Sequence, residues 1–190
     1  MSAYLVRFDL LFPEIAEHET RLLALNGGQA FPTDDYGLLE SYCPDPGCDC
    51  QRVMLNIISR RDQNQVATIS YGFDRTAIHA GPYLDPLNPQ SPYAAALLRI
   101  IGAYLESEPA YVQRLKAHYA LIKAAANPNH PAHHKLSAWL GEAQKLTKMD
   151  DPAADLREAL RVISEHEPAF KALERKSRQK HRHSAKKTGK

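Results

Sequence analysis

The sequence lacks any uninterrupted apolar segment long enough to cross a membrane, and it lacks a leader-like beginning. A membrane-spanning helix needs about 20 consecutive apolar residues, whereas the hydrophobic residues here, 44% of the chain, are interspersed with charged ones. The first twenty residues contain several acids and Pro13, where a secretory signal needs a continuous apolar stretch. We therefore expect a cytoplasmic protein without membrane contact, in a compartment that keeps thiols reduced.

The motifs of several large enzyme classes are also missing. The chain has no Walker A loop, no G-x-G-x-x-G turn, no H-E-x-x-H pair and no G-x-S-x-G elbow. Two groups of ionisable residues are expected to be solvated surface: Glu14, Glu17 and Glu19, and His130, His133 and His134. The sequence therefore favours a binding protein over an enzyme.

Strand patterns fill the first half of the sequence, and helix patterns fill the second half. Four segments are rich in β-branched, aromatic and other apolar residues and are expected to be strands: 19–25, 36–42, 52–59 and 65–73. Because the links between them are short, we expect an antiparallel sheet of about four strands. Helices are expected from Ser91-Pro92 onward, over 109–125, around Trp139 and from Asp151-Pro152. The predicted fold class is therefore α+β.

The same patterns predict four regions along the chain. They are an antiparallel β region with a Cys-cluster metal site over 1–80, a proline-rich connector over 81–92, a helical region packing on the sheet over 93–174, and a disordered basic tail over 175–190. We find no internal repeat.

Cysteine is scarce, and its distribution is informative. Only three cysteines are present, an odd number that cannot close into pairs, and all lie within eight residues, Cys43-Pro-Asp-Pro-Gly-Cys48-Asp-Cys50. Proline and glycine at the centre of residues 45–48 predict a type II turn, which brings Cys43 towards Cys48. Cys48 and Cys50, two apart in an extended segment, point to one face. Three thiolates can therefore converge on one zinc ion.

A structural zinc site usually has four ligands, so three cysteines leave one to be found. In an antiparallel meander, the start of the first strand and the exit of the fourth lie at the same end as the loop between the second and third. His79, after the fourth strand, is the leading fourth ligand, and His18, before the first, is the alternative. Asp45 and Asp49 are expected to ligate the ion or to accept a hydrogen bond from the ligating imidazole.

Charge is distributed unevenly, although the formal net charge is only +2. The tail has no acid and eight basic residues: Arg175, Lys176, Arg178, Lys180, Arg182, Lys186, Lys187 and Lys190. The other sixteen Lys and Arg face all twenty-two Asp and Glu, so residues 1–174 carry about −6. A flexible basic segment can contact phosphates without sequence preference. It has no aromatic residue to stack on bases.

These features predict a zinc-stabilised cytosolic binding or adaptor module without catalytic activity, whose protein partner the sequence does not identify. One alternative is a metal-dependent hydrolase with an open zinc position near the Cys43–Cys50 loop and Asp49 or Glu19 as base. Another is a nucleic-acid-associated protein that uses the basic tail for non-specific contacts. Three thiolates reduce the Lewis acidity of zinc, which favours a structural ion over a catalytic one.

Overall fold

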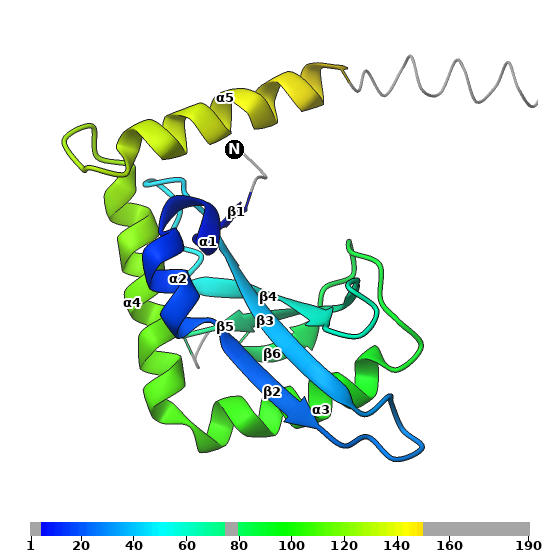
Figure 1. The fold of residues 1–190 in the computed structure, drawn as a ribbon. Helices are drawn as coiled ribbons and strands as arrows, with labels where there is room; N and C mark the ends of the chain where they lie inside the picture. Colours follow the sequence, from blue (N-terminus) through cyan, green and yellow to red (C-terminus); the bar gives the residue numbers. More distant parts are fainter. Residues whose placement is uncertain (1–4, 75–79, 150–190) are drawn as a thin grey trace, which may run out of the picture. The chain divides into compact units, whose positions relative to one another are not determined.

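The chain forms an antiparallel sheet of six strands with helices packed against it (Figure 1). The computed structural model describes residues 5–74 and 80–149, with the backbone alone for 145–149. Two compact units follow one another along the chain, Met1–Gly141 and Glu142–Lys190. The sheet and the cysteine cluster both belong to the first unit.

The order of elements is mixed at the start and helical at the end. The strands are β1 (Val6–Arg7), β2 (Arg21–Leu25), β3 (Asp34–Tyr42), β4 (Arg52–Ser59), β5 (Gln65–Gly72) and β6 (Gly81–Leu84). The helices are α1 (Phe8–Leu11), α2 (Pro13–Glu19), α3 (Ala94–Ser107), α4 (Pro109–Ala125) and α5 (His133–Met149). None of the helices in the described part of the chain is both long and apolar enough to cross a membrane.

Strand β3 is the longest strand and organises the sheet. One of its edges pairs with β4, and β5 and β6 follow in order. Its other edge is shared by two short strands, because β1 pairs at Ser41 and Tyr42 while β2 pairs with residues 34–38. All of these pairings are antiparallel. The end of β3 that carries the cysteine loop therefore has β1 beside it.

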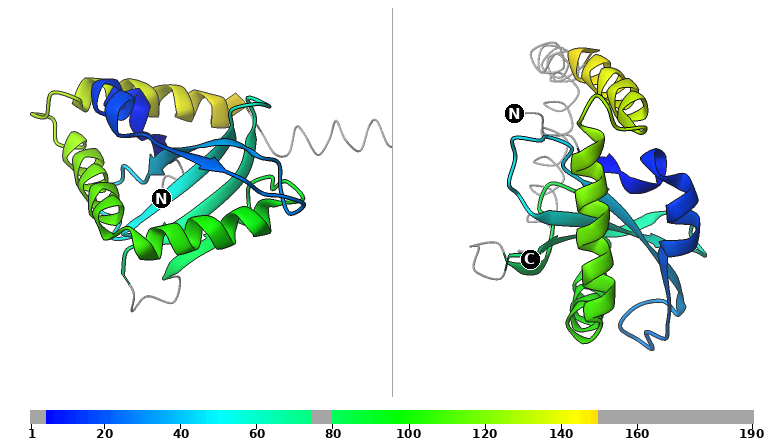
Figure 2. Two further views of the ribbon diagram at one scale, coloured as in Figure 1. Left: turned by 60° about the horizontal axis from the view of Figure 1, so that its bottom comes forward. Right: turned by 90° about the vertical axis from the view of Figure 1, so that its left-hand side faces the viewer.

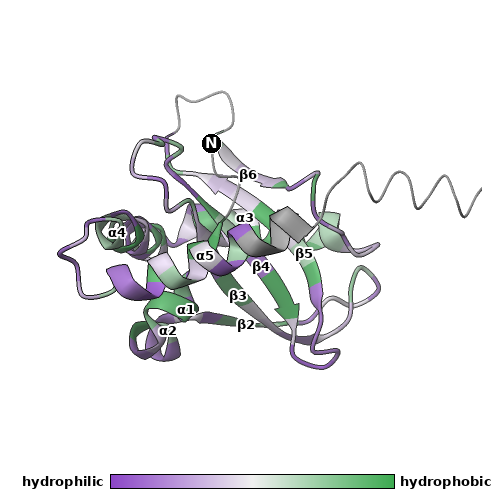
Figure 3. Ribbon diagram, turned by 90° about the horizontal axis from the view of Figure 1, so that it is seen from above, coloured by the Kyte–Doolittle hydropathy of each residue, from purple (hydrophilic) through white to green (hydrophobic). Residues whose placement is uncertain are grey.

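One face of the sheet is buried, as the alternation along β4 shows. Val53, Leu55 and Ile57 are fully buried, and the residues between them are only partly buried. Figure 3 shows hydrophobic residues along β3 and β5 as well. The helices complete this core with five fully or nearly fully buried side chains: Leu97, Ile101, Leu105, Leu115 and Ile122. At about 25 cal/mol per Å² of apolar area, such burial is the main stabilising term.

Helices α3 and α4 turn a corner at Glu108 (Figures 1 and 2). Pro109 disfavours helical geometry at the residue before it and fits the first position of a new helix, so it ends α3 and starts α4. The predicted helix over 109–125 is confirmed. The helix expected from Ser91-Pro92 onward begins later, at Ala94, because the chain first makes a turn in which the Ser91 carbonyl accepts the Ala94 N–H.

The predicted α+β class with an N-terminal antiparallel sheet is confirmed. The four predicted strands correspond to β2 to β5. Strand β6 lies inside the range 81–92 that was predicted as a connector, and it is an edge strand, where Pro82 is tolerated. The predicted helices beyond Asp151 and the basic tail lie outside the described residues.

Candidate metal centre

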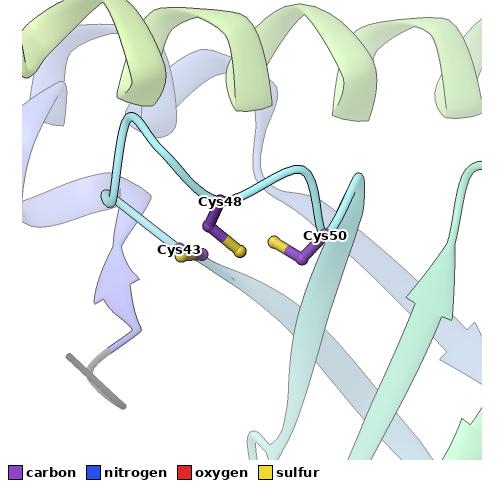
Figure 4. Close-up of side chains that lie close together, drawn as sticks. All are labelled: Cys43, Cys48 and Cys50. Atoms are coloured by element: carbon purple, nitrogen blue, oxygen red, sulfur yellow. The ribbon is translucent and has the colours of Figure 1, made fainter. Parts of the chain in front are cut away.

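The three cysteines lie in and beside the loop that joins β3 to β4. Cys43 follows the last residue of β3 directly and is buried, whereas Cys48 and Cys50 are partly exposed. Their sulfur atoms lie within 4.8 Å of one another. Figure 4 shows the side chains of Cys48 and Cys50 turned towards each other, with Cys43 beside them. The predicted convergence of the three thiols is therefore confirmed.

This spacing is close to what a tetrahedral ion requires. Zinc–sulfur bonds of about 2.3 Å in tetrahedral geometry separate sulfur atoms by about 3.8 Å. The sulfur atoms here lie at most 4.8 Å apart, so small side-chain movements bring them to that separation. The cluster can hold a metal ion through three thiolates.

A tight turn folds the loop back, although not by the predicted geometry. The Cys48 N–H donates to the Asp45 carbonyl over 3.2 Å, which closes a turn over residues 45–48. The Asp45 side chain also accepts the Gly47 N–H, over 2.9 Å. A type II turn needs a positive φ at its third residue, and among the described glycines only Gly28 and Gly81 have one. The type II assignment is therefore wrong, because the Asp45 side chain organises the turn in its place.

Lys123 of α4 holds the loop from outside. Its ammonium group donates to the carbonyl oxygens of Asp45 and Cys48, the latter over 2.8 Å. It also lies 5.2 Å from the centre of the Tyr119 ring. Sequence reasoning missed Lys123, since it is 75 residues from Cys48 and no local pattern connects the two.

The thiols influence one another's protonation. Hydrogen bonds from the Cys50 backbone N–H and from the Cys50 thiol lower the pKa of Cys48. Burial, together with the neighbouring thiols, raises the pKa of Cys50 to about 12. The charge of Lys123 lowers the pKa of both groups. Cys48 therefore ionises more readily than Cys50, and a cation is what makes three thiolates together favourable.

Among the described residues, no histidine or carboxylate joins the three sulfurs. His18 lies on α2, because the chain is helical up to Glu19 and β2 begins only at Arg21. Its side chain is exposed. The place beside the end of β3 is taken by β1, with Val6 opposite Tyr42. The choice of His18 as the alternative fourth ligand assumed that the strand after it, β2, reaches the end of the sheet that carries the cysteine loop.

His79 lies outside the described residues. The residues described before it do approach the loop, since the Phe73 N–H donates to the Gln51 carbonyl over 2.8 Å. Gly72 and Gly81 also pair with each other, and Gly72 pairs with Arg52 at the start of β4. The strands on either side of residues 75–79 therefore meet the end of the sheet that carries the cysteines.

The two loop aspartates differ in their surroundings. Asp45 shapes the turn through its side chain and binds Lys123 through its carbonyl. Asp49 is exposed. The three histidines near the start of α5 each bind a nearby backbone group: His130 accepts the Ala132 N–H, and His133 and His134 contact the carbonyls of Ala125 and Pro131.

Comparison with known proteins gave no match: no family model, no curated protein and no solved structure is similar to this chain. The three-cysteine cluster with its lysine is therefore the feature on which a functional assignment depends.

Proposed function

We propose that the first unit is a zinc-stabilised binding or adaptor module, with zinc held by Cys43, Cys48 and Cys50. The observation that carries the proposal is the convergence of three sulfurs within 4.8 Å from one eight-residue segment. Thiolate ligands in tetrahedral geometry are typical of zinc. Bound there, the ion would tie the end of β3 to the start of β4.

The charge around the cluster supports a structural ion. Three thiolates and Zn²⁺ together carry one negative charge, and the Lys123 ammonium, bonded to the Cys48 carbonyl, supplies one positive charge. A site neutralised in this way polarises a bound water weakly, which disfavours the hydrolase alternative. Glu19, proposed as a base in that alternative, is engaged with His118 and Arg114.

For the fourth ligand we propose His79, with His18 as the alternative. A histidine completes a Cys₃His site, a common structural zinc set. Replacing each histidine by alanine tests this assignment. Loss of zinc in only the His79→Ala protein supports it, and retention of zinc in both variants assigns the position to an aspartate or to solvent.

The central experiment is metal analysis of the full chain purified without a histidine tag. We expect about one equivalent of zinc per chain. Cys48→Ser removes one thiolate and should lower the zinc content to below about a tenth of an equivalent, since a site of two thiolates binds far more weakly.

The matched control is Gly47→Ala, in the same turn. A Cβ atom at Gly47 meets only the Asp45 side chain, at 3.5 Å, which is ordinary contact. This variant should keep its zinc. Purified wild-type protein that neither contains zinc nor takes it up would refute the proposal.

The nucleic-acid alternative depends on residues 175–190, which lie outside the described part of the chain. A truncation that removes them leaves the zinc site intact under our proposal. The two functions are therefore separable by experiment.

A further inference from the structure

A buried histidine on α4 bridges two carboxylates from different elements. The Nδ1 atom of His118 lies 2.7 Å from Glu40 Oε2 on β3, and its Nε2 atom lies 3.0 Å from Glu19 Oε2 at the end of α2. The imidazole is 3% exposed and is stacked on the Phe8 ring of α1, with centroids 3.9 Å apart. One side chain therefore connects α1, α2, β3 and α4.

Other charged and titratable groups surround this array. On β3 the Tyr42 hydroxyl donates to Glu40 Oε2 over 2.6 Å, and on α4 Arg114 lies 3.7 Å from Glu19. Tyr111 of α4 has Arg114 and Arg21 of β2 over its ring, at 5.0 and 5.5 Å. Helix α1 contributes only the uncharged ring of Phe8. Burial raises the pKa of Tyr42 well above its ordinary value, so its hydroxyl remains a donor.

The two short contacts of His118 impose a proton count. A neutral imidazole has one N–H donor and one bare nitrogen, and an ionised carboxylate only accepts. Both contacts are hydrogen bonds only when the imidazole and the two carboxyl groups together hold two protons. The second proton belongs to the coupled group rather than to one residue.

Exposure decides which contact breaks when one proton leaves. The Glu40 side chain is 4% exposed, and that of Glu19 is 38% exposed. Loss of the His118 donor would leave the buried Glu40 carboxylate with the Tyr42 hydroxyl as its donor, which is costly, so the remaining proton stays between His118 and Glu40. The bare Nε2 then faces Glu19 Oε2, and two lone pairs at this distance repel each other. Glu19 can then turn to solvent, a movement that also breaks its 3.7 Å ion pair with Arg114 of α4.

We propose that Glu19, His118 and Glu40 form a proton-operated latch that holds the end of α2 on α4 and releases it when pH rises. The release frees the connection from α2 to β2 while the His118–Glu40 contact remains. None of these three residues belongs to the cysteine cluster, so this inference does not depend on zinc.

Hydrogen–deuterium exchange of the full chain over a pH series tests the latch, with rates normalised for the intrinsic effect of pH. The reporters are two amides of the α2 hydrogen-bond ladder. The Ala16 N–H donates to the Phe12 carbonyl, and the Thr20 N–H donates to the Ala16 carbonyl. We expect their protection to fall about tenfold or more with rising pH, as for loss of one charge-assisted hydrogen bond. The ring nitrogens of His118, followed by ¹⁵N NMR, should titrate over the same interval.

Glu19→Gln is the decisive variant, because an amide can accept from an N–H or donate to a bare nitrogen. Its protection at Ala16 and Thr20 should be independent of pH. Glu17→Gln, exposed on the same helix, makes the same change of charge and should keep the wild-type response. Protection in the wild type that is flat with pH, or that changes equally in Glu19→Gln, overturns the latch. A His118 ring that titrates outside the interval of release overturns it too.

Discussion

Two residues outside the cysteine set shape the candidate metal site. Gln51 follows the third cysteine with a φ of 37°, in the left-handed region that residues with a Cβ atom enter at a cost of about 1–2 kcal/mol. Its carbonyl accepts the Phe73 N–H, which helps to hold this conformation. Lys123 holds the other side of the loop. The loop is therefore held by the chain just after β5 and by α4.

Replacing Lys123 should weaken zinc binding without removing any ligand. Lys123→Met removes the charge and both hydrogen bonds to the loop, and charge-assisted hydrogen bonds are worth about 1.5–3 kcal/mol. We therefore expect zinc affinity to fall by about tenfold or more, measured by competition with a chromogenic chelator.

Lys123→Arg separates charge from geometry, since guanidinium keeps the charge but is planar and larger. Its loss of affinity should be the smaller of the two. Lys116→Met, on the same helix, is the control for helix and net charge and should bind zinc like the wild type. Equal affinities of Lys123→Met and the wild type would contradict a role for Lys123.

At the scale of elements, local patterns predicted what local physics decides. The bounds of α4 follow from Pro109 and from helical periodicity, so they were predictable. The buried face of α4 includes Tyr111 and His118. His118 can be buried because Glu40 on β3 gives it a polar partner, and no local sequence pattern reveals that partner. Strands β1 and β6 are two and four residues long, too short for a strand pattern.

In the candidate site, too, contacts between residues near in sequence were predictable and contacts between distant residues were not. The cysteine spacing predicted the convergence of the sulfurs, because turn chemistry and alternation along the chain act over a few residues. The contact with Lys123 arises only when α4 packs beside the loop, so it could not be predicted.

Asp34, the first residue of β3, binds the turn between β4 and β5 and should make the stability of the protein depend on pH in acid. Its carboxylate accepts the Ser59 hydroxyl and the N–H groups of Arg61 and Asp35, and these bonds, that of Ser59 above all, lower its pKa. A lowered folded-state pKa gives stability that is present above the unfolded value, near 3.8, and is lost as pH falls through the folded value.

Asp34→Asn removes that contribution, so we expect the variant to be less stable than the wild type near neutral pH. The difference in the free energy of unfolding should shrink as pH falls below about 4. Denaturant unfolding at several pH values, followed by circular dichroism, measures it. Glu14→Gln, an exposed carboxylate on α2, should show no such trend. A difference that stays constant with pH would exclude a contribution from Asp34 ionisation.

At the scale of the whole molecule, the candidate site joins the parts of the first unit. Cys43 follows β3 directly, and one residue separates Cys50 from β4. The loop is bonded to α4 and, through Gln51, to the chain after β5. An ion bound there stabilises the folded state in proportion to its binding, since the unfolded chain offers no preformed site.

Thermal stability should therefore depend on free zinc. Each tenfold rise in free zinc above the dissociation constant adds about 1.4 kcal/mol, which in a domain of this size raises Tm by roughly 3–6 °C. The effect should weaken as pH falls, because burial raises the pKa of Cys50 to about 12 and zinc must displace its proton. Scanning calorimetry in zinc–chelator buffers measures both dependences. In Cys48→Ser, Tm should be independent of zinc, whereas a wild-type Tm that ignores zinc would mean that the ion does not hold these elements together.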